Sequence, residues 1–345
     1  MSSTAPLRLI VDTAALAANW RHLAARSGVT CGAAVKADAY GLGAHGTVRA
    51  LAEAGCRDFF VAHWNEAAAL GDLGDDVRVA VFHGIAPGEE ALATGRAVPV
   101  LNTPAQVTRW REIAAGRACD IMIDTGLNRL GLSLAEATSG LLDGIEIRTL
   151  HSHLACADDR DHPLNALQLQ RFREAVAAVP HQRASLANSA GTCLGPDYAF
   201  DMIRPGIALY GWVAYPDHAR SLQRVVGIEA SVVQVRDVGV GQAFGYNATW
   251  TATRPTRLAL ANLGYADGYR RAFSNLGAVR FGGQRCPVVG RVSMDLIGVD
   301  VTGLDVAEGD WLEVDFDLDT AAGATGIAQY ELLTGLGHRY QRRYI

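Results

Sequence analysis

Residues 32–54 read GAAVKADAYGLGAHGTVRALAEA. A short apolar run ends at Lys36, a glycine-rich turn follows, and residues 44–54 have the apolar spacing of an amphipathic helix. The stretch therefore predicts one strand followed by one helix. A lysine at the C-terminal end of a buried strand is partly desolvated, which favours its neutral, nucleophilic amine, and the glycines let backbone N–H groups approach a phosphate. The alternative is a lysine that merely ends a strand.

The same strand-then-helix pattern continues on both sides of this stretch. Eight short apolar runs are expected to be strands, at 33–36, 59–62, 77–82, 98–101, 120–123, 145–151, 184–187 and 203–209. Helical patterns lie at 14–25, 44–54, 103–115 and 165–179, whereas 84–95 is short and contains glycine and proline. Repeated strand–helix units predict an α/β fold in which residues 1–225 form a (β/α)8 TIM-like barrel.

Beyond residue 225 the pattern changes. The segments 227–238, 256–263, 278–281, 288–301 and 311–316 are rich in β-branched residues and are separated by Gly, Pro and Asp turns without long helices. They predict a second, mostly β domain over residues 226–345. A first strand at 7–11 precedes the barrel, and we expect it to pair with this β domain.

Composition narrows the function classes. The 345 residues suit two domains, and 31 basic against 36 acidic side chains give a net charge of -5, which favours neither a nucleic acid nor a membrane as partner. No stretch has the form of a signal peptide or a transmembrane helix. The six cysteines include no C-x-x-C pair, which is typical of free thiols in a reducing cytoplasm and argues against a zinc ribbon.

Polar residues gather where the expected barrel strands end, and barrel enzymes place their active sites there. They are Lys36, Tyr40, Arg129, His153, Asn188, Ser189 and Arg204, and Gly206 and Ile207 lie just after Arg204. Loops after strands seven and eight commonly bind phosphate in this fold, and Ser189 with the backbone of Gly206 and Ile207 would supply the donors. A lysine opposite such a phosphate site, with Arg204 available to a pyridine nitrogen, predicts pyridoxal 5'-phosphate as the cofactor.

Each of these residues has a simpler interpretation. His153 could be a structural histidine, or form a metal pair with His151, although no third ligand is evident. Arg204 could be a surface residue that closes a strand, and Asn188 with Ser189 could be a helix cap. Their joint occurrence at strand ends favours the cofactor site, and no metal is expected.

Six segments match one known family in order. They are 34–41 (AVKADAYG), 124–131 (DTGLNRLG), 187–190 (ANSA), 204–211 (RPGIALYG), 264–269 (GYADGY) and 290–295 (GRVSMD). Over nearly its whole length the chain resembles alanine racemase, a pyridoxal-phosphate-dependent isomerase with an N-terminal barrel and a C-terminal β domain. The resemblance implies interconversion of L- and D-alanine, which supplies D-alanine for cell-wall peptidoglycan.

The resemblance also implies the roles of individual residues. Lys36 holds the cofactor, His153 supports its ring and Arg204 faces its nitrogen. Arg129, Met294 and Asp295 contact the substrate. The residues that surround the cofactor phosphate are Tyr40, Ser189, Gly206, Ile207 and Tyr330, and Asn188 also binds the cofactor.

Racemisation requires proton removal on one face of the α-carbon and proton return on the other, so one base per face is the simplest solution. By resemblance the bases are Lys36 and Tyr265, and the phenol pKa of Tyr265, ordinarily about 10, must be lowered for it to act as a base. Tyr265 belongs to the β domain. Lys36, in contrast, belongs to the barrel. In the family a head-to-tail homodimer brings the two bases together, because the β domain of one subunit completes the other subunit's site.

Three positions depart from the family pattern. Leu42 stands where many relatives have histidine, and Ser293 where many have cysteine. Met122 matters most, because many relatives have there a lysine whose carbamate holds the equivalent of Arg129. What positions Arg129, and whether the enzyme prefers alanine, serine or a broader range, therefore stays open.

Two other classes remain as alternatives. A non-catalytic protein of pyridoxal-phosphate homeostasis would need Lys36 and the phosphate loops but no β domain and no Tyr265. A decarboxylase of the related fold would have the β domain but not the 264–269 run.

Overall fold

A computed structural model describes residues 5–114 and 116–345. The chain divides into two compact units. The first is Ala14–Arg224, and the second joins the N-terminal residues up to Thr13 to Val225–Ile345. Each unit is described by itself.

The first unit is built around parallel strands. A seven-stranded sheet has the order β3-β4-β5-β6-β7-β8-β9. Its members are β3 (Ala33–Ala34), β4 (Asp58–Val61), β5 (Arg78–Val81), β6 (Val98–Leu101), β7 (Cys119–Met122), β8 (Ile147–His151) and β9 (Arg183–Ser185). Each strand pairs with the next one along the chain, as right-handed strand–helix–strand connections require.

An eighth strand closes the ring. β10 (Met202–Ile203) pairs in parallel with β2 (Thr30–Cys31), which continues into β3 after Gly32. A Cβ at position 32 would lie 2.7 Å from the Phe60 ring, so only glycine fits there. On the other side of β10, the Arg204 N–H donates to the Ala187 carbonyl at 2.9 Å. The predicted (β/α)8 barrel is confirmed.

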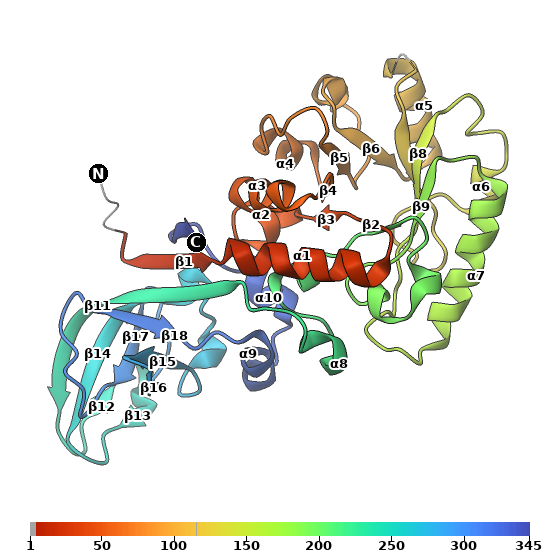
Figure 1. The fold of residues 1–345 in the computed structure, drawn as a ribbon. Coiled ribbons are helices and arrows are strands. Elements are labelled where there is room, and N and C mark those ends of the chain that lie inside the picture. Colours follow the sequence, from red (N-terminus) through yellow and green to blue (C-terminus); the bar gives the residue numbers. More distant parts are fainter. Residues whose placement is uncertain (1–4, 115) are drawn as a thin grey trace. The chain divides into compact units, whose positions relative to one another are not determined.

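Helices lie around the barrel strands in Figure 1. They are α1 (Thr13–Ser27), α3 (Ala44–Ala54), α4 (Trp64–Ala69), α5 (Pro104–Ile113), α6 (Leu134–Ala137) and α7 (Pro163–Ala178). The expected helix 103–115 ends at Ile113, and its last residue lies outside the described residues. After β5 the chain makes only the short 3₁₀ helix η1 (Glu90–Thr94), which accords with the short, proline-bearing sequence there.

One strand prediction was wrong in extent. The run 203–209 was expected to be a single strand, but β10 ends at Ile203 and Ile207–Tyr210 form the 3₁₀ helix η4. Pro205 has no N–H to donate to a neighbouring strand, and Gly206 adopts φ -121° and ψ -88°, outside the strand range. The chain therefore turns as soon as the barrel is closed.

The barrel interior contains an apolar layer and a charged layer. Ala34, Phe60, Ala80, Val100, Met122 and Met202 form one buried cluster. The buried carboxylates of Asp58 and Asp120 are each paired with arginines, Asp58 with Arg78 and Arg183, and Asp120 with Arg148. Burial opposes ionisation of Asp58, but hydrogen bonds from its two arginines lower its pKa to about 2.

The second unit is mostly β, as predicted. Its eight-stranded sheet has the order β14-β17-β16-β15-β18-β11-β1-β19, with an additional pairing of β14 with β11. The strands are β1 (Leu7–Val11), β11 (Val226–Val238), β14 (Thr256–Asn262), β15 (Ala278–Phe281), β16 (Gln284–Val289), β17 (Leu296–Asp300), β18 (Trp311–Val314) and β19 (Gln341–Tyr344). β1 pairs antiparallel with β11. Helices α9 (Leu318–Thr325) and α10 (Gln329–Thr334) complete the unit.

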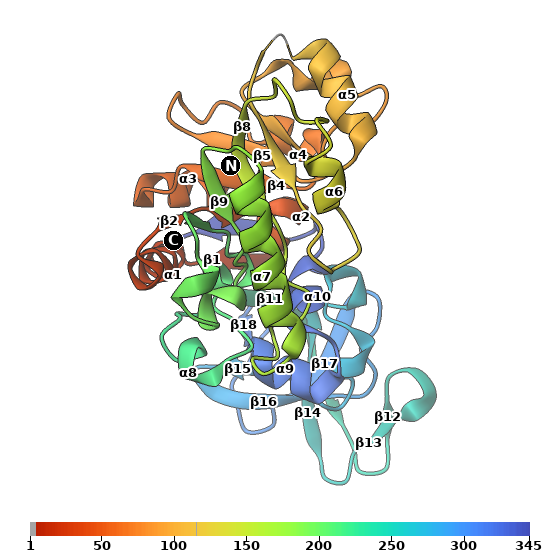
Figure 2. The ribbon, with the colours of Figure 1, turned by 90° about the vertical axis from the view of Figure 1, so that its right-hand side faces the viewer.

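Two details of this unit matter below. The expected strand 288–301 is interrupted: β16 ends at Val289 and β17 begins at Leu296, so 290–295 form a loop. Gly290, at φ +72°, starts that loop. The hairpin of β12 (Ala243–Phe244) and β13 (Trp250–Thr251) projects from one end of the sheet (Figure 2). Among the described residues, no helix combines the length and the apolar character needed to cross a membrane.

Candidate active site

Lys36 opens a left-handed turn at the end of β3. The four residues that follow it, Ala37–Tyr40, all have φ between 53° and 56°. A left-handed conformation costs a non-glycine residue about 1–2 kcal/mol, so the turn stores about 4–8 kcal/mol of strain. Glycine-rich sequence around Lys36 predicted a tight turn, but not that the alanines themselves would be left-handed.

Hydrogen bonds on both sides of the turn hold it in place. The Ala39 N–H donates to the Val35 carbonyl at 2.8 Å, and the Gly41 N–H to the Ala37 carbonyl at 2.9 Å. The Asp38 carboxylate accepts the Ala44 N–H at 2.7 Å, which ties the turn to the start of α3. The turn ends with Tyr40, whose ring packs on Tyr210 with centroids 5.0 Å apart.

Lys36 lines a cavity of about 320 Å³ at the C-terminal ends of the barrel strands. Its other lining residues are Ala62, Phe82, His83, Met122, Leu127, Arg129, Leu130 and His153. Three residues predicted from strand ends, Lys36, Arg129 and His153, therefore share one cavity. Apolar walls with a few converging polar groups are typical of a small-molecule site.

The cavity lowers the basicity of its titratable groups. Burial lowers the pKa of Lys36 from its ordinary 10.5, and the nearby Arg129 guanidinium lowers it further. Burial is also the main reason why the pKa of His153 falls to about 3, with Arg204, Arg129 and Lys36 adding to the effect. At neutral pH, His153 is therefore an uncharged imidazole and Lys36 has a larger neutral fraction than an exposed lysine.

Ser189, Gly206 and Tyr40 form a small polar cradle beside this cavity. The Ser189 hydroxyl, which is buried, accepts the backbone N–H groups of Gly206 at 2.9 Å and Ala208 at 3.1 Å. A Cβ at position 206 would lie 2.1 Å from the Tyr40 hydroxyl, so the phenol rests directly on the glycine backbone. Burial raises the pKa of Tyr40 to about 12, so its hydroxyl remains a donor. The Asn188 side chain accepts the Gly191 N–H at 2.8 Å, where the short helix η2 (Gly191–Cys193) begins.

Arg204 is buried, and among residues 5–114 and 116–345 no carboxylate forms an ion pair with it. Its guanidinium donates to the Ser185 hydroxyl and, at 2.6 Å, to the Ser152 carbonyl, both neutral acceptors. Burial lowers its pKa to about 9, and the field of Asp120 opposes that change. A buried cation with only neutral acceptors is costly, and a polar ring atom of a cofactor would compensate for it.

Arg129 is exposed in the loop after β7. The Asp124 carboxylate shapes this loop by accepting the Gly126 N–H at 2.8 Å and the Asn128 N–H at 3.1 Å. Within residues 5–114 and 116–345, no hydrogen bond or ion pair to the Arg129 guanidinium is found. Met122 lines the same cavity and offers it no anion or acceptor.

The second unit presents Tyr265 from a tightly constrained turn. Its N–H donates to the Ser293 carbonyl at 3.0 Å, and the Ala266 N–H to the Met294 carbonyl at 3.1 Å. The Asp267 carboxylate accepts the Gly264 N–H at 2.9 Å. The two segments 264–267 and 293–295 are thus held together, with Tyr265 40% and Met294 54% exposed.

Arg339 braces this arrangement from the C-terminal segment. It donates to both oxygens of the buried Asp267, at 2.7 and 2.9 Å, and to Asp295 at 2.7 Å. Such a bidentate pair fixes direction as well as distance. The sequence interpretation did not single out Arg339. Tyr330 lies on α10 in the same unit, and its relation to the cradle in the barrel stays a prediction.

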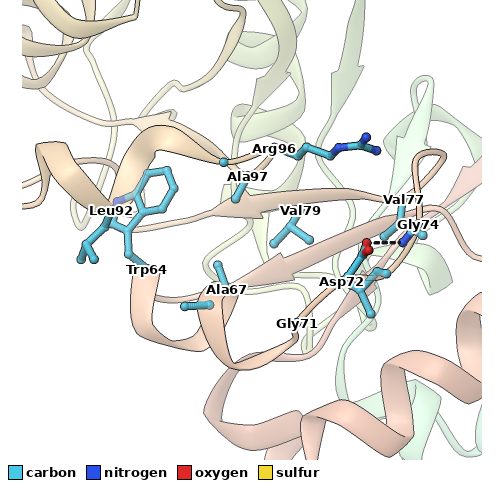
Figure 3. Close-up of a pocket in the computed structure, with 13 residues that line it drawn as sticks. Trp64, Ala67, Gly71, Asp72, Gly74, Val77, Val79, Leu92, Arg96 and Ala97 are labelled. Carbon is cyan, nitrogen blue, oxygen red and sulfur yellow. Dashed lines mark hydrogen bonds between the residues drawn. The ribbon is translucent and has the colours of Figure 1, made fainter.

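A second depression on the barrel lies elsewhere (Figure 3). It measures about 380 Å³ and lies between α4, β5 and the segment 92–97 that leads into β6, where η1 replaces a full helix. Trp64, Val79 and Leu92 are among its lining residues. Its two charged groups are engaged, Arg96 with Asp75 and Asp72 with the Gly74 N–H. Because none of its lining residues lies at the C-terminal end of a barrel strand, we do not assign the site there.

Comparison with known proteins decides the family. The family model "Alanine racemase, N-terminal domain" matches residues 11–213, and "Alanine racemase, C-terminal domain" matches residues 225–344. The chain belongs to the alanine racemase family. It is 44% identical to a catabolic alanine racemase of Agrobacterium fabrum, over 98% of this chain and 92% of that protein. It is 42% identical to the biosynthetic enzyme of the same organism, over 99% and 94%.

Solved structures of the family have the same fold. The alanine racemase of Bartonella henselae, solved with covalently bound pyridoxal phosphate, has a TM-score of 0.90 and 38% identity. The match covers 99% of this chain and 100% of that one. The enzyme class, an isomerase of the alanine racemase family, is therefore established for this chain, and the two alternative classes are not supported.

One signal in the sequence escaped the prediction. Lys36 is the only lysine in the chain, and all its other basic residues apart from histidine are arginines. Arginine cannot give up its proton at physiological pH, whereas a desolvated lysine can. Lys36 is thus the one side-chain amine of the sequence, and it lines this cavity.

Proposed function

We propose that this alanine racemase family member interconverts L- and D-alanine with Lys36 and Tyr265 as its two bases. The observation that carries the proposal is the single lysine of the chain, held at the C-terminal mouth of the barrel in a cavity that lowers its pKa. The family itself depends on pyridoxal phosphate. When bound, this cofactor supplies an aldehyde that condenses with amines and a ring that stabilises the negative charge left at the α-carbon.

The residues of the barrel fit that cofactor. The cradle of Ser189, Gly206 and Tyr40 leaves no room for a side chain at position 206. The Ser189 hydroxyl, which accepts two backbone N–H groups, and the Tyr40 hydroxyl are donors that suit a phosphate. Asn188 and Ile207 flank this cradle on the two loops. We propose that Tyr330, which belongs to the second unit, also contacts the phosphate. Arg204, buried and surrounded by neutral acceptors, would face the ring nitrogen, and neutral His153 would support the ring.

The two bases act on opposite faces of the substrate. The Lys36 amine removes or returns the α-proton on one face, and the Tyr265 hydroxyl does so on the other. Arg129, Met294 and Asp295 contact the substrate. Because Arg129 lies within Coulomb range of Lys36, it also helps keep the amine neutral.

The two units of the chain have different roles in the proposed reaction. The barrel binds the cofactor, and the β unit supplies Tyr265, Met294 and Asp295 to a partner subunit in a head-to-tail homodimer. The exposed Tyr265 and Met294 support this arrangement, since apolar groups on a rigid turn suit an interface. We place the enzyme in the cytoplasm, in line with its six free cysteines, and assign it the supply of D-alanine for peptidoglycan.

Two measurements test the proposal. Borohydride reduction of the holoenzyme, followed by mass spectrometry of peptides, should find the phosphopyridoxyl group on Lys36, and Lys36→Arg should carry none. Racemisation should then be measured for a panel of L- and D-amino acids. Alanine is expected to have the highest kcat/KM, while a higher value for serine would make this a serine-preferring member. An unmodified Lys36 in an active holoenzyme would overturn the assignment.

A further inference from the structure

Glu66 connects three parts of the barrel at the Lys36 turn. It lies in the first turn of α4, and one carboxylate oxygen accepts the Ala37 N–H at 2.8 Å. The other oxygen accepts the Ala62 N–H at 2.6 Å. Ala37 is the first left-handed residue after Lys36, and Ala62 lines the same cavity directly after β4. One half-buried carboxylate therefore ties the strained turn to the neighbouring strand.

An ordinary glutamate at a helix start behaves differently, and this chain contains one for comparison. Glu136 occupies the same third position in α6, and its carboxylate returns to the backbone N–H of its own cap residue, Ser133, at 2.8 Å. That is a local capping box. Glu66 instead reaches a residue 29 positions earlier in the chain. Helix capping alone does not account for that contact.

Glu66 is also part of the charge environment of Lys36. Around Lys36, Arg129 opposes protonation of the amine, whereas Glu66 favours it. Burial lowers the pKa of His83 and of His153, and the charge of Lys36 lowers both further. On the outer side of Glu66, His63 Nδ1 lies 3.9 Å from the carboxylate. Glu66 is thus both a mechanical tie and the nearby anion.

We propose that Glu66 is the positioning residue of Lys36: its carboxylate holds the left-handed turn against the end of β4 and so fixes the lysine amine in the cavity. This rests on the proposed role of Lys36 in holding the cofactor. In Glu66→Gln, one acceptor oxygen becomes an NH₂ group that faces a backbone N–H, so one of the two bonds is lost. In Glu66→Asp the charge remains, but the shorter side chain cannot span both N–H groups.

The single lysine allows a direct test. Protein grown on lysine labelled with ¹³C at Cε gives one side-chain resonance, which reports the titration of Lys36 in the cofactor-free enzyme. We expect Glu66→Gln to shift this titration to lower pH, because an anion that favours the charged amine is removed. We expect Glu66→Asp to titrate closer to wild type. Both variants should bind pyridoxal phosphate about tenfold or more weakly, because a charge-assisted bond is lost.

Glu136→Gln is the matched control and should leave both the titration and the cofactor affinity unchanged. Circular dichroism and thermal unfolding of each variant establish that it is folded. Folded Glu66→Gln and Glu66→Asp with wild-type titration and wild-type affinity would overturn the positioning role. That outcome is distinct from failure of the proposed function, which would appear as wild-type holoenzyme without a label on Lys36.

Discussion

Tyr265 carries the phenol that we propose for the face opposite Lys36. Replacing it by phenylalanine keeps the ring and removes only the hydroxyl, so Tyr265→Phe should slow racemisation by about 10²–10⁴-fold, the usual contribution of a general base. Lys36 should still exchange the α-proton of one enantiomer with solvent. The measurement is deuterium incorporation from D₂O, followed separately for L- and D-alanine. Equal residual exchange from both enantiomers would argue for a single base.

Met122 has no anionic or hydrogen-bonding group that could hold Arg129. A guanidinium beside a bound cofactor needs an anion or acceptor, and a carbamate on another lysine cannot provide it, because Lys36 is the only lysine. Racemisation should therefore be indifferent to removal and restoration of bicarbonate at fixed pH. If a small anion such as chloride fills the gap, the rate should depend on halide at constant ionic strength. Activity that recovers only with bicarbonate would contradict this interpretation of Met122.

The sequence predicted some site residues better than others, and the reason is geometric. Lys36, Arg129 and His153 come at strand ends, and the cavity brings these three together as the barrel rule predicts. The same rule applied to the third strand would have found His83, which lies two residues after the end of β5 at Val81. Glu66 could not be found this way, since its importance lies in a contact that only the folded turn creates.

At the scale of elements, strand order was predictable because each β/α unit repeats the same local pattern. The strand predictions that were wrong in extent lie where the backbone properties of proline and glycine outweigh the apolar pattern. The apolar run 203–209 contains Pro205 and Gly206, so it bends into η4 instead of extending β10. Likewise the chain leaves the sheet at Gly290, and the loop 290–295 packs against the Tyr265 turn.

We expect Arg339 to be needed for the correct position of the Tyr265 turn. If its bidentate contact with Asp267 and its bond to Asp295 hold the turn in register, Arg339→Ala should lower kcat about ten- to a hundredfold, since small misplacements of a catalytic group are costly. Exchange of the α-proton should fall only for the enantiomer whose α-proton Tyr265 removes. Arg343→Ala removes an exposed arginine of β19 and serves as the control. Equal loss of exchange from both enantiomers would indicate a general structural defect.

At the scale of the whole molecule, the barrel core should make stability depend on pH. Burial lowers the pKa of His151 from 6.5 to about 4, although Asp120 opposes the change. Between these values the unfolded chain binds the proton and the folded chain does not, so stability is retained above pH 6.5 and falls as the pH falls towards 4. The loss approaches about 3 kcal/mol at 1.36 kcal/mol per pH unit.

Urea unfolding of wild type and His151→Gln from pH 4 to 8 measures this effect. The variant should show a flatter dependence in that window, whatever its absolute stability. His45→Gln, which removes an exposed histidine, should keep the wild-type slope. An unchanged slope in His151→Gln would mean that His151 does not carry the effect.

Assembly provides the remaining prediction, because Lys36 and Tyr265 belong to different units of the chain. If each site combines Lys36 of one subunit with Tyr265 of the other, Lys36→Ala and Tyr265→Ala homodimers are both inactive. A mixed dimer, however, contains one site with both residues intact and one with neither. After complete exchange of equal amounts, half the dimers are mixed, so activity should recover to about a quarter of the wild-type level. Subunit exchange is verified independently by mass spectrometry of differently tagged chains. Proven exchange without recovery would place both bases in one chain, since then no mixed dimer could contain an intact pair.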